Sequence, residues 1–169
     1  MKPLLLVDGY NVIGAWPEAR EKGYALDESR DRLFHLLQDY AGYSGEEVVL
    51  VFDGHKSERR TRHVDGHPGA SVVYTRQGET ADSYIERQVY LCPKYRQVRV
   101  ATNDALEQSQ SLAKGATRVT AGELLRSLKE IRQGESRRYV QAGMAKKNPI
   151  ASRLTAQQRD ILERLRRGS

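Results

Sequence analysis

The chain has 169 residues, of which 38% are hydrophobic and 30% are charged, which suits one well-buried domain with an appendage. No apolar run approaches the roughly 20 residues that a membrane-spanning helix needs, so we expect no membrane partner and a cytoplasmic location. Cys92 is the single cysteine, which excludes an intramolecular disulfide and a cysteine-rich zinc site. The oligomeric state stays open, with a monomer slightly favoured.

The net charge of +6 is unevenly distributed along the chain. Residues 1–128 hold 17 Lys and Arg against 18 Asp and Glu, a net charge of −1, whereas residues 129–169 hold 11 against 4, a net charge of +7. A near-neutral body with a cationic tail indicates an anionic polymer or an acidic surface as partner. A solvated tail that only aids solubility explains the charge equally well.

Short aliphatic runs alternate with helical patterns along the chain. Most of these runs are rich in Val and Leu without polar alternation, which is typical of buried parallel strands. The predicted strands are 3–8, 47–53, 71–75, 97–102 and 116–121. The predicted helices between and after them are 26–45, 80–92, 104–115 and 121–143. This alternation predicts an α/β sandwich with a mainly parallel sheet of about five strands.

Local signals refine these elements. Asp27 is the predicted N-cap of the first helix, and Gly42 and Gly45 are its predicted stop. Residues 53–70 have no hydrophobic period and carry four close cations, so we predict a mobile basic loop. Three tyrosines with mostly helical spacing are predicted to pack in the core rather than to form a base-stacking platform: Tyr84, Tyr90 and Tyr95.

The hydrophobic pattern weakens after about residue 143, which predicts a main domain at 1–143 and a basic linker with a C-terminal helix at 144–169. The final helix has a capping box, with Thr155 as N-cap and Gln158 three residues later. Its apolar stripe is narrow, and the pattern does not choose between docking on the domain and folding against a partner.

Acidic residues fall where predicted strands end. Asp8 and Asp53 close the first two strands, Asp104 follows the fourth by two residues, and Asp82 opens a helix just after Glu79. The carboxyl ends of parallel strands lie on one rim, where ligands bind at the point of reversed strand order. Carboxylates brought together need a counter-charge, and oxygen ligands suit Mg²⁺ or Mn²⁺.

Each acid also has a purely structural explanation. Asp8 and Asp53 each precede a glycine and so fit a turn, while Asp104, Asp82 or the neighbouring Thr80 fits a helix cap. The coincidence of several acids on one rim nevertheless favours a metal site. Such ions catalyse phosphoryl and phosphodiester transfer by activating water and stabilising charge.

Four segments together resemble one known family. "LLLVDGYNVIG" (4–14), "VFDG" (51–54), "GETADSYIER" (78–87) and "VATND" (100–104) resemble the YacP-like branch of the NYN-domain ribonucleases, within the PIN-like superfamily. The resemblance covers about residues 1–140. It implies a PIN-like (Rossmann-like) three-layer α/β fold, a divalent-metal acidic pocket and endonucleolytic cleavage of RNA.

The resemblance also implies roles for individual residues. Asp8, Asp82 and Asp104 would bind metal, with help from Asp53, and Asn11 would orient a ligand or a water molecule. Gly9 would let the backbone turn close to metal and phosphate. Glu79 is a candidate for a further acid on a helix. The residues expected to contact RNA or to shape its pocket are Lys56, Arg59, Arg60, Arg62, Thr80, Thr102, Asn103, Arg137, Arg138, Lys146 and Lys147.

These implications define the main hypothesis: a Mg²⁺- or Mn²⁺-dependent endoribonuclease that cleaves single-stranded RNA or mRNA by in-line hydrolysis of the phosphodiester. The basic tail would dock onto a larger RNA assembly, with the ribosome as the obvious candidate. Two alternatives stay open: a non-catalytic RNA- or ribosome-binding module, and a phosphatase or 5′-nuclease acting on DNA. The choice of RNA over DNA follows from the resemblance, since recognition of the 2′-hydroxyl leaves no short motif.

Overall fold

The computed structural model describes residues 1–54, 64–105, 109, 114–147 and 156–168, without the side chains of 64–67, 135–147, 156–160 and 162. The predicted cap Thr155 and most of the helix predicted at 104–115 lie outside these ranges. So do four cations of the predicted basic loop: Lys56, Arg59, Arg60 and Arg62.

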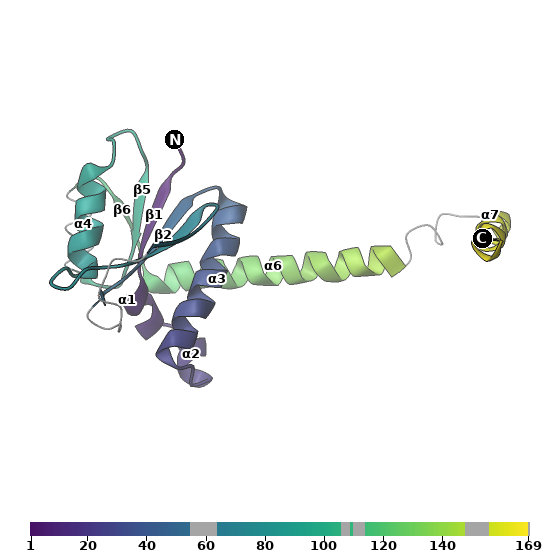
Figure 1. The fold of residues 1–169 in the computed structure, drawn as a ribbon, viewed down its shortest axis with the longest axis horizontal. Coiled ribbons are helices and arrows are strands. Elements are labelled where there is room, and N and C mark those ends of the chain that lie inside the picture. The colour runs from purple at the N-terminus through teal and green to yellow at the C-terminus, as the bar shows by residue number, and fades with distance from the viewer. Residues whose placement is uncertain (55–63, 106–108, 110–113, 148–155, 169) are drawn as a thin grey trace. The chain divides into compact units, whose positions relative to one another are not determined.

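A six-stranded sheet forms the centre of the domain (Figure 1). Its strands are β1 (Leu4–Asp8), β2 (Glu47–Phe52), β3 (Val64–His67), β4 (Ala70–Tyr74), β5 (Val98–Ala101) and β6 (Thr117–Val119). Their spatial order is β3-β4-β2-β1-β5-β6. Five of them pair in parallel, which confirms the predicted mainly parallel sheet.

The antiparallel edge strand β3 was not expected. It forms a hairpin with β4, in which Val64 pairs with Val73 and His67 with Ala70. Gly69 has a φ of +85° and supplies the left-handed residue that so tight a connection needs. The sequence of β3, VDGH, has no aliphatic run, because an edge strand need not be buried on both faces.

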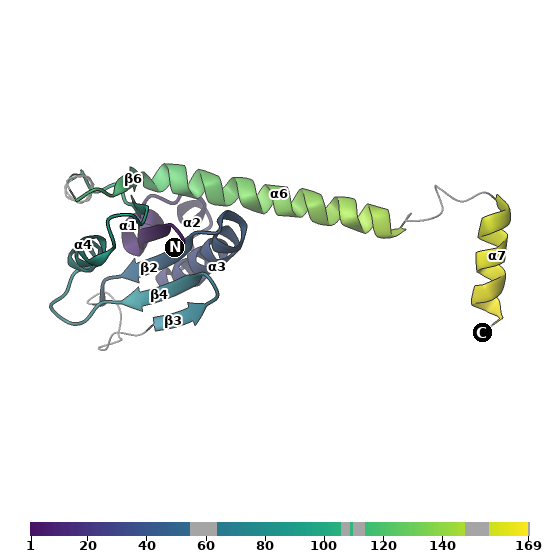
Figure 2. The same ribbon diagram turned by 90° about the horizontal axis from the view of Figure 1, so that it is seen from above.

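Helices cover both faces of the sheet, which makes the predicted three-layer PIN-like fold (Figure 2). The sheet is covered by α1 (Gly9–Gly14), α2 (Pro17–Glu21), α3 (Leu26–Ser44), α4 (Ala81–Leu91) and the first part of α6 (Ala121–Lys147). A further helix, α7 (Ala156–Arg167), follows near the end of the chain. Successive strand residues point to opposite faces. Leu5 and Val7 of β1 therefore pack with α1, α2, α3 and the start of α6, while Leu4 and Leu6 pack with α4.

The boundaries of α3 differ from the prediction. Its N-cap is Ala25, which has no side chain that could cap, and Asp27 lies one residue inside the helix, in its first turn. The helix continues through Gly42 and ends at Gly45, whose φ of 74° is left-handed. A glycine ends a helix when it adopts this conformation, and Gly42 does not adopt it.

Only one of the three tyrosines predicted to pack in the core does so. Tyr84 is buried against the sheet, whereas Tyr90 is 75% exposed and Tyr95 is 78% exposed. The buried face of α4 includes Ile85 and Val89, and a helix turns by about 100° per residue, so Tyr90 falls outside that face. Tyr95 lies in the loop that follows α4.

The chain divides into two compact units, Met1–Ile131 and Arg132–Ser169. The helix α6 contributes residues to both units, and α7 belongs to the second. The predicted domain boundary at residue 143 stays a prediction. In the part of the chain that the structure describes, no helix is both long enough and apolar enough to cross a membrane.

Candidate functional site

The strand order reverses beside β1. The chain proceeds from β1 to β2 and β4 on one side, then crosses to β5 and β6 on the other side. Ligands of open parallel sheets bind at the carboxyl ends of the strands where the order reverses. Asp8 is the last residue of β1, and Asp104 follows the end of the neighbouring β5. Two of the predicted acids therefore flank the point where this fold binds ligands.

The other two acids reach the same rim from the side of α4. Alternate residues of a strand point to the same face of the sheet, so Asp8 points to the face of Leu4 and Leu6, which pack in the core that α4 covers. Asp53 follows the last residue of β2, in phase with Val51 of that core. Asp82 lies in the first turn of α4 itself. The fold thus brings carboxylates from four separate segments to one end of the sheet.

Asp8 has a structural role in addition to its position. It is 9% exposed and is the N-cap of α1, where its Oδ1 accepts a hydrogen bond from the Asn11 backbone N–H at 3.4 Å. The turn at Asp8–Gly9, one of the structural explanations that the sequence left open, does not form, because the helix begins directly at Gly9.

Gly9 is required for packing rather than for an unusual backbone. Its φ is not positive, and a Cβ at this position would lie 2.3 Å from the Phe52 ring. The ring of Phe52 in turn lies 4.9 Å from that of Tyr10 and 5.5 Å from that of Tyr74, measured between centroids. The absence of a side chain at Gly9 lets β1 and α1 approach the end of β2.

Asn11 connects α1 to the segment that carries Asp104. Its Oδ1 accepts a hydrogen bond from the Asn103 backbone N–H at 2.7 Å. The Oδ1 of Asn103 accepts one from the Ala121 N–H at 2.8 Å, at the start of α6. The hydroxyl of the fully buried Thr102 accepts one from the Asp104 N–H at 3.1 Å. Asn11, Thr102 and Asn103, predicted to orient a ligand and shape the pocket, thereby hold the loop of Asp104.

Thr75, which sequence reasoning missed, connects the loops of the other two acids. It is 0% exposed, and its Oγ1 accepts a hydrogen bond from the Gly54 N–H at 2.9 Å while donating one to the Glu79 carbonyl at 2.8 Å. A Cβ on Gly54 would lie 1.9 Å from the Thr75 carbonyl oxygen, so this approach requires glycine. A polar residue that ends an aliphatic run, the signal that identified Asp8, would also have identified Thr75.

The turn before α4 is held by its own contacts. Thr80 is the N-cap, one of the alternatives that the sequence left open, and its Oγ1 accepts a hydrogen bond from the Ser83 N–H at 3.1 Å. Glu79 forms an ion pair with Arg87, in which Nη2 of Arg87 donates a hydrogen bond to Oε1 of Glu79 at 2.5 Å. Asp82, in the first turn, lies where the positive end of the helix dipole favours an acid.

The basic side chain of Arg30 lies beside Tyr10, at the start of α1. Arg30 of α3 donates a hydrogen bond from Nη1 to the Tyr10 hydroxyl at 3.0 Å. Burial alone would lower the pKa of the Arg30 guanidinium, but the hydrogen bond to Tyr10 and the nearby Tyr74 and Asp27 raise it by more. Arg30 therefore remains a permanent positive charge next to the first turn of α1.

The donor atoms at the rim fit a hard divalent cation bound through few protein ligands. Carboxylate oxygens are the ligands that Mg²⁺ and Mn²⁺ prefer, and Mg²⁺ usually keeps several water molecules while binding one or two carboxylates. Among the described residues, no three His, Cys, Asp or Glu side chains are grouped closely enough to hold a metal ion. Asp8, Asp53, Asp82 and Asp104 thus converge on the rim without forming a ready-made cage.

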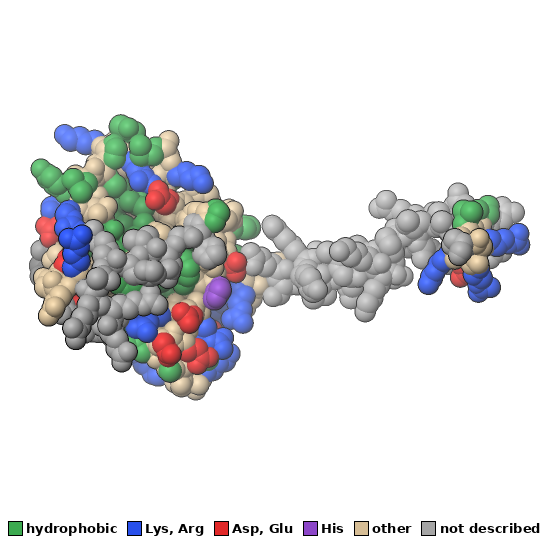
Figure 3. Space-filling model, viewed as in Figure 1, with side chains coloured by type: hydrophobic (Ala, Val, Ile, Leu, Met, Phe, Trp, Pro, Cys, Tyr) green, Lys and Arg blue, Asp and Glu red, His purple; other side chains and the backbone are tan. Residues whose placement is uncertain are grey.

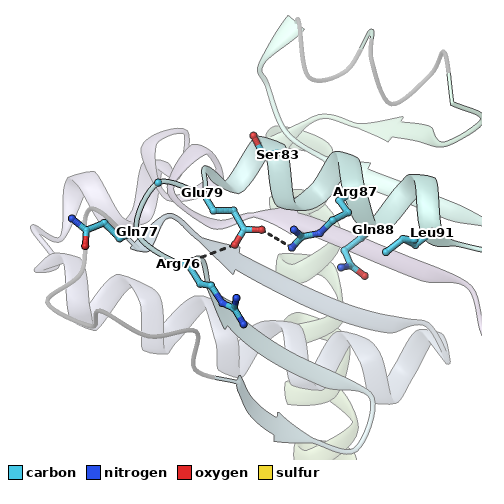
Figure 4. A pocket seen from close by; sticks show the side chains of 8 residues that line it. Arg76, Gln77, Glu79, Ser83, Arg87, Gln88 and Leu91 are labelled. Carbon is cyan, nitrogen blue, oxygen red and sulfur yellow. Dashed lines mark hydrogen bonds and ion pairs between the residues drawn. The ribbon is translucent and has the colours of Figure 1, made fainter.

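A groove beside α4 adjoins this rim (Figure 4). It encloses about 630 Å³ and begins at the turn between β4 and α4. Its lining is mainly polar: Arg76, Gln77, Gly78, Glu79, Ser83, Arg87, Gln88 and Leu91. The cations that the sequence assigned to RNA are not among the lining residues. Arg137, Arg138, Lys146 and Lys147 belong to the part of α6 of which only the backbone is described, and the loop cations lie outside the described residues.

The chain resembles known proteins over nearly its whole length. A sequence profile of the YacP-like NYN domain matches residues 5–167. The protein YacP of Bacillus subtilis (strain 168), which is named as uncharacterized, is 38% identical over 137 residues, which cover 80% of each chain.

Solved structures of Rae1 (YacP) from Bacillus subtilis match as well. One is 34% identical, with a TM-score of 0.71, and the match covers 98% of this chain and 95% of that one. A mutant of the same protein is 37% identical, with a TM-score of 0.69 and coverage of 83% and 82%. The chain therefore belongs to the YacP-like NYN domain family, a nuclease-type family whose function is related to RNA.

Proposed function

We propose that the chain is a divalent-metal-dependent endoribonuclease that cleaves single-stranded RNA or mRNA in the cytoplasm, in a ribosome-associated context. The observation that carries the proposal is the placement of Asp8. This buried carboxylate ends the central strand at the point where strand order reverses, with Asp104 beyond the end of the neighbouring strand. A module that only bound RNA would gain nothing from carboxylates beside phosphate groups.

Asp8, Asp82 and Asp104, with help from Asp53, would hold Mg²⁺ or Mn²⁺. When bound, such an ion neutralises charge on the phosphate and activates water for hydrolysis. The protein's own contribution is to hold the acids in place. Asn11 and Thr102 fix the loop of Asp104, and Thr75 joins Gly54, which follows Asp53, to Glu79 in the turn before α4. Hydrolysis in line would leave 3′-hydroxyl and 5′-phosphate ends.

An acidic pocket needs cations at its margin to attract RNA. We assign this role to Lys56, Arg59, Arg60 and Arg62 of the basic loop, as proposed from the sequence. The second unit would provide docking to the ribosome. Its helix α7 exposes Ile161 and Leu165 and ends with three arginines, a combination suited to an anionic surface: Arg164, Arg166 and Arg167.

The experiment that tests the function compares wild type with Asp8→Asn on a long single-stranded RNA and on ribosome-bound mRNA, each with Mn²⁺ or EDTA. Asparagine is as good an N-cap as aspartate, so the variant keeps the cap of α1 while it loses the charge. We expect internal cuts with Mn²⁺ that EDTA and the substitution each abolish.

Asp39→Asn is the matched control, because it removes an exposed acid from α3, near the end where that helix leads into β2. It should cleave like wild type. Cuts on ribosome-bound mRNA alone would support the proposed context. No cleavage of either substrate, with equal RNA binding by wild type and Asp8→Asn, would overturn the enzyme in favour of a binding module.

A further inference from the structure

We propose that the outer side of α4 and the groove beside it bind single-stranded RNA, with Tyr90 and Tyr95 as stacking platforms for its bases. The inference rests on the proposed function, because it adds a path for the strand that the acidic rim would cut. It assigns a role in substrate binding to Tyr90 and Tyr95, for which the sequence predicted packing in the core. Three features carry it: the exposed side chains, the charges among them, and the continuity of the groove.

Large hydrophobic side chains are exposed where α4 ends. Tyr90 is 75% exposed, Leu91 65% and Tyr95 78%, all within six residues of sequence. Single exposed hydrophobic residues are ordinary, but contiguous ones mark interaction sites. Figure 3 shows hydrophobic side chains gathered around the end of α4 and the loop that follows it, with Lys and Arg side chains among them.

The charged residues around these exposed side chains are mainly basic, which favours an anionic ligand. Lys114 places its Nζ 5.8 Å from the centroid of the Tyr90 ring, within the range of a cation–π contact. The groove and the exposed end of α4 together carry five cations and three acids, a net charge of +2. The cations are Arg76, Arg87, Lys94, Arg96 and Lys114, and the acids are Glu47, Glu79 and Glu86.

Each of these acids is engaged by one of the cations. Glu86 pairs with Lys114 at 2.6 Å, Glu79 with Arg87 at 2.5 Å, and Glu47 with Arg96. An approaching phosphate therefore meets little uncompensated negative charge. Arg87 remains 48% exposed in its ion pair, and a guanidinium has five N–H donors, so the pairing with Glu79 holds it in place with donors to spare.

The groove connects this surface to the acidic rim. It begins at Arg76 and Glu79, in the turn that leads directly to Asp82, and ends at Leu91, next to Tyr90 (Figure 4). The 11 residues of α4 make the path about 16 Å long, enough for several nucleotides. A strand that leaves the rim along α4 would therefore meet arginines first and aromatic rings at the end.

Single-stranded RNA fits this combination better than a protein does. Cations along a groove neutralise the phosphates, and exposed tyrosine rings stack on bases of any sequence. A protein interface would instead have an apolar centre with charges around its rim. Here the apolar side chains lie at one end, and the rest of the groove is lined by arginine, glutamine, serine, glycine and one glutamate, Glu79, which pairs with Arg87.

The test measures equilibrium binding of a fluorescent single-stranded oligoribonucleotide of about 12 nucleotides, within the usual range of site sizes. All proteins are full-length and carry Asp8→Asn, so that binding is read without cleavage. We expect Tyr90→Ala with Tyr95→Ala to weaken binding at least fivefold, because each substitution removes a ring on which a base stacks. Tyr43→Ala is the control, since Tyr43 is 60% exposed but belongs to α3, on the other face of the sheet.

Two further measurements locate the site. Arg76→Gln should weaken binding and make it less dependent on salt, by about one unit of slope. Photocrosslinking of RNA that contains 4-thiouridine should label peptides of residues 87–96 in the parent protein. Unchanged affinity in the double tyrosine variant would overturn the proposal, as would crosslinks confined to residues 129–169. A dimer that the tyrosine substitutions dissociate, seen by sedimentation velocity, would overturn it in favour of a second copy of the chain.

These outcomes are independent of the proposed activity. Loss of stacking in the double variant, combined with no cleavage by the protein that retains Asp8, would support the RNA path and overturn the nuclease. Cleavage that depends on Asp8, combined with unchanged binding in the tyrosine variant, would do the reverse.

Discussion

The side-chain oxygen of Asn11 and the backbone amide of Asn103 are joined by a 2.7 Å hydrogen bond across 92 residues of sequence. Asn11 also donates its backbone N–H to Asp8, and Asn103 is followed directly by Asp104. One residue thus contacts both sides of the point where strand order reverses. Its side chain acts here as an acceptor, which is a role that aspartate could also fill.

We therefore expect Asn11→Ala to lower the free energy of unfolding by about 1 kcal/mol, the typical net contribution of one hydrogen bond, and Asn11→Asp to lower it less. Urea denaturation of the two variants checks this. Cleavage should fall in Asn11→Ala because the Asp104 loop is no longer held. Equal destabilisation by both substitutions would show that the acceptor oxygen is not what the fold requires.

Gly9 and Gly14 lie in the same short helix and offer a matched pair. Gly9→Ala would place a Cβ 2.3 Å from the Phe52 ring, and overpacking of this kind costs about 1–3 kcal/mol. Gly14→Ala meets nothing within 4 Å and should be neutral or stabilising, because alanine favours helix. Thermal melts of both variants distinguish the two positions.

A second substitution separates crowding from a need for backbone freedom. If Phe52 is the obstacle, Phe52→Leu should cost less in the Gly9→Ala protein than in wild type, a non-additivity typical of residues in contact. Strict additivity would argue that Gly9 is required for another reason.

The sequence predicted correctly the strands that are buried along almost their whole length. β1 and β2 are buried on both faces, so their aliphatic runs identified them without further information. The acids identified the rim because carboxyl ends of parallel strands must share it. Gly45 ended α3 as expected, since its left-handed conformation is a local property.

Features that depend on distant residues could not be read from the sequence in this way. The need for glycine at position 9 comes from Phe52, and the role of Thr75 comes from Gly54. β3 exists because β4 offers a free edge, and its own sequence carries little signal. Tyr90 has the spacing of a packing residue, yet only the rotation of α4 against the sheet decides which face is buried.

Thr75 should stabilise the fold more through its hydroxyl than through its methyl group. Thr75→Val keeps the shape but leaves the Gly54 N–H without its acceptor, which costs about 1–3 kcal/mol for a buried donor. Thr75→Ser keeps the hydroxyl and loses only a methyl group, so we expect a smaller loss. Chemical denaturation of the two variants is the measurement. A larger loss for serine than for valine would mean that the methyl group, rather than the hydroxyl, holds these loops.

The raised pKa of Tyr40 predicts how the free energy of unfolding changes at high pH. Burial is the main cause that raises the pKa of its hydroxyl above the ordinary 10.0, and Glu46 adds to this while Arg99 opposes it. The hydroxyl accepts a 2.6 Å hydrogen bond from Arg99 and donates one of 3.2 Å to Glu46. A pKa that folding raises means that the folded state keeps the proton when the unfolded state loses it.

The contribution of Tyr40 is therefore complete below about pH 10 and is lost as the pH rises through its folded-state pKa. At neutral pH we expect Tyr40→Phe to be less stable than wild type by about 1–2 kcal/mol, from its lost hydrogen bonds. Above about pH 10 the two free energies of unfolding should converge, because only wild type loses this contribution. Tyr43→Phe, on the exposed face of the same helix, should follow the wild-type curve. A gap between Tyr40→Phe and wild type that stayed constant or widened with pH would contradict the raised pKa.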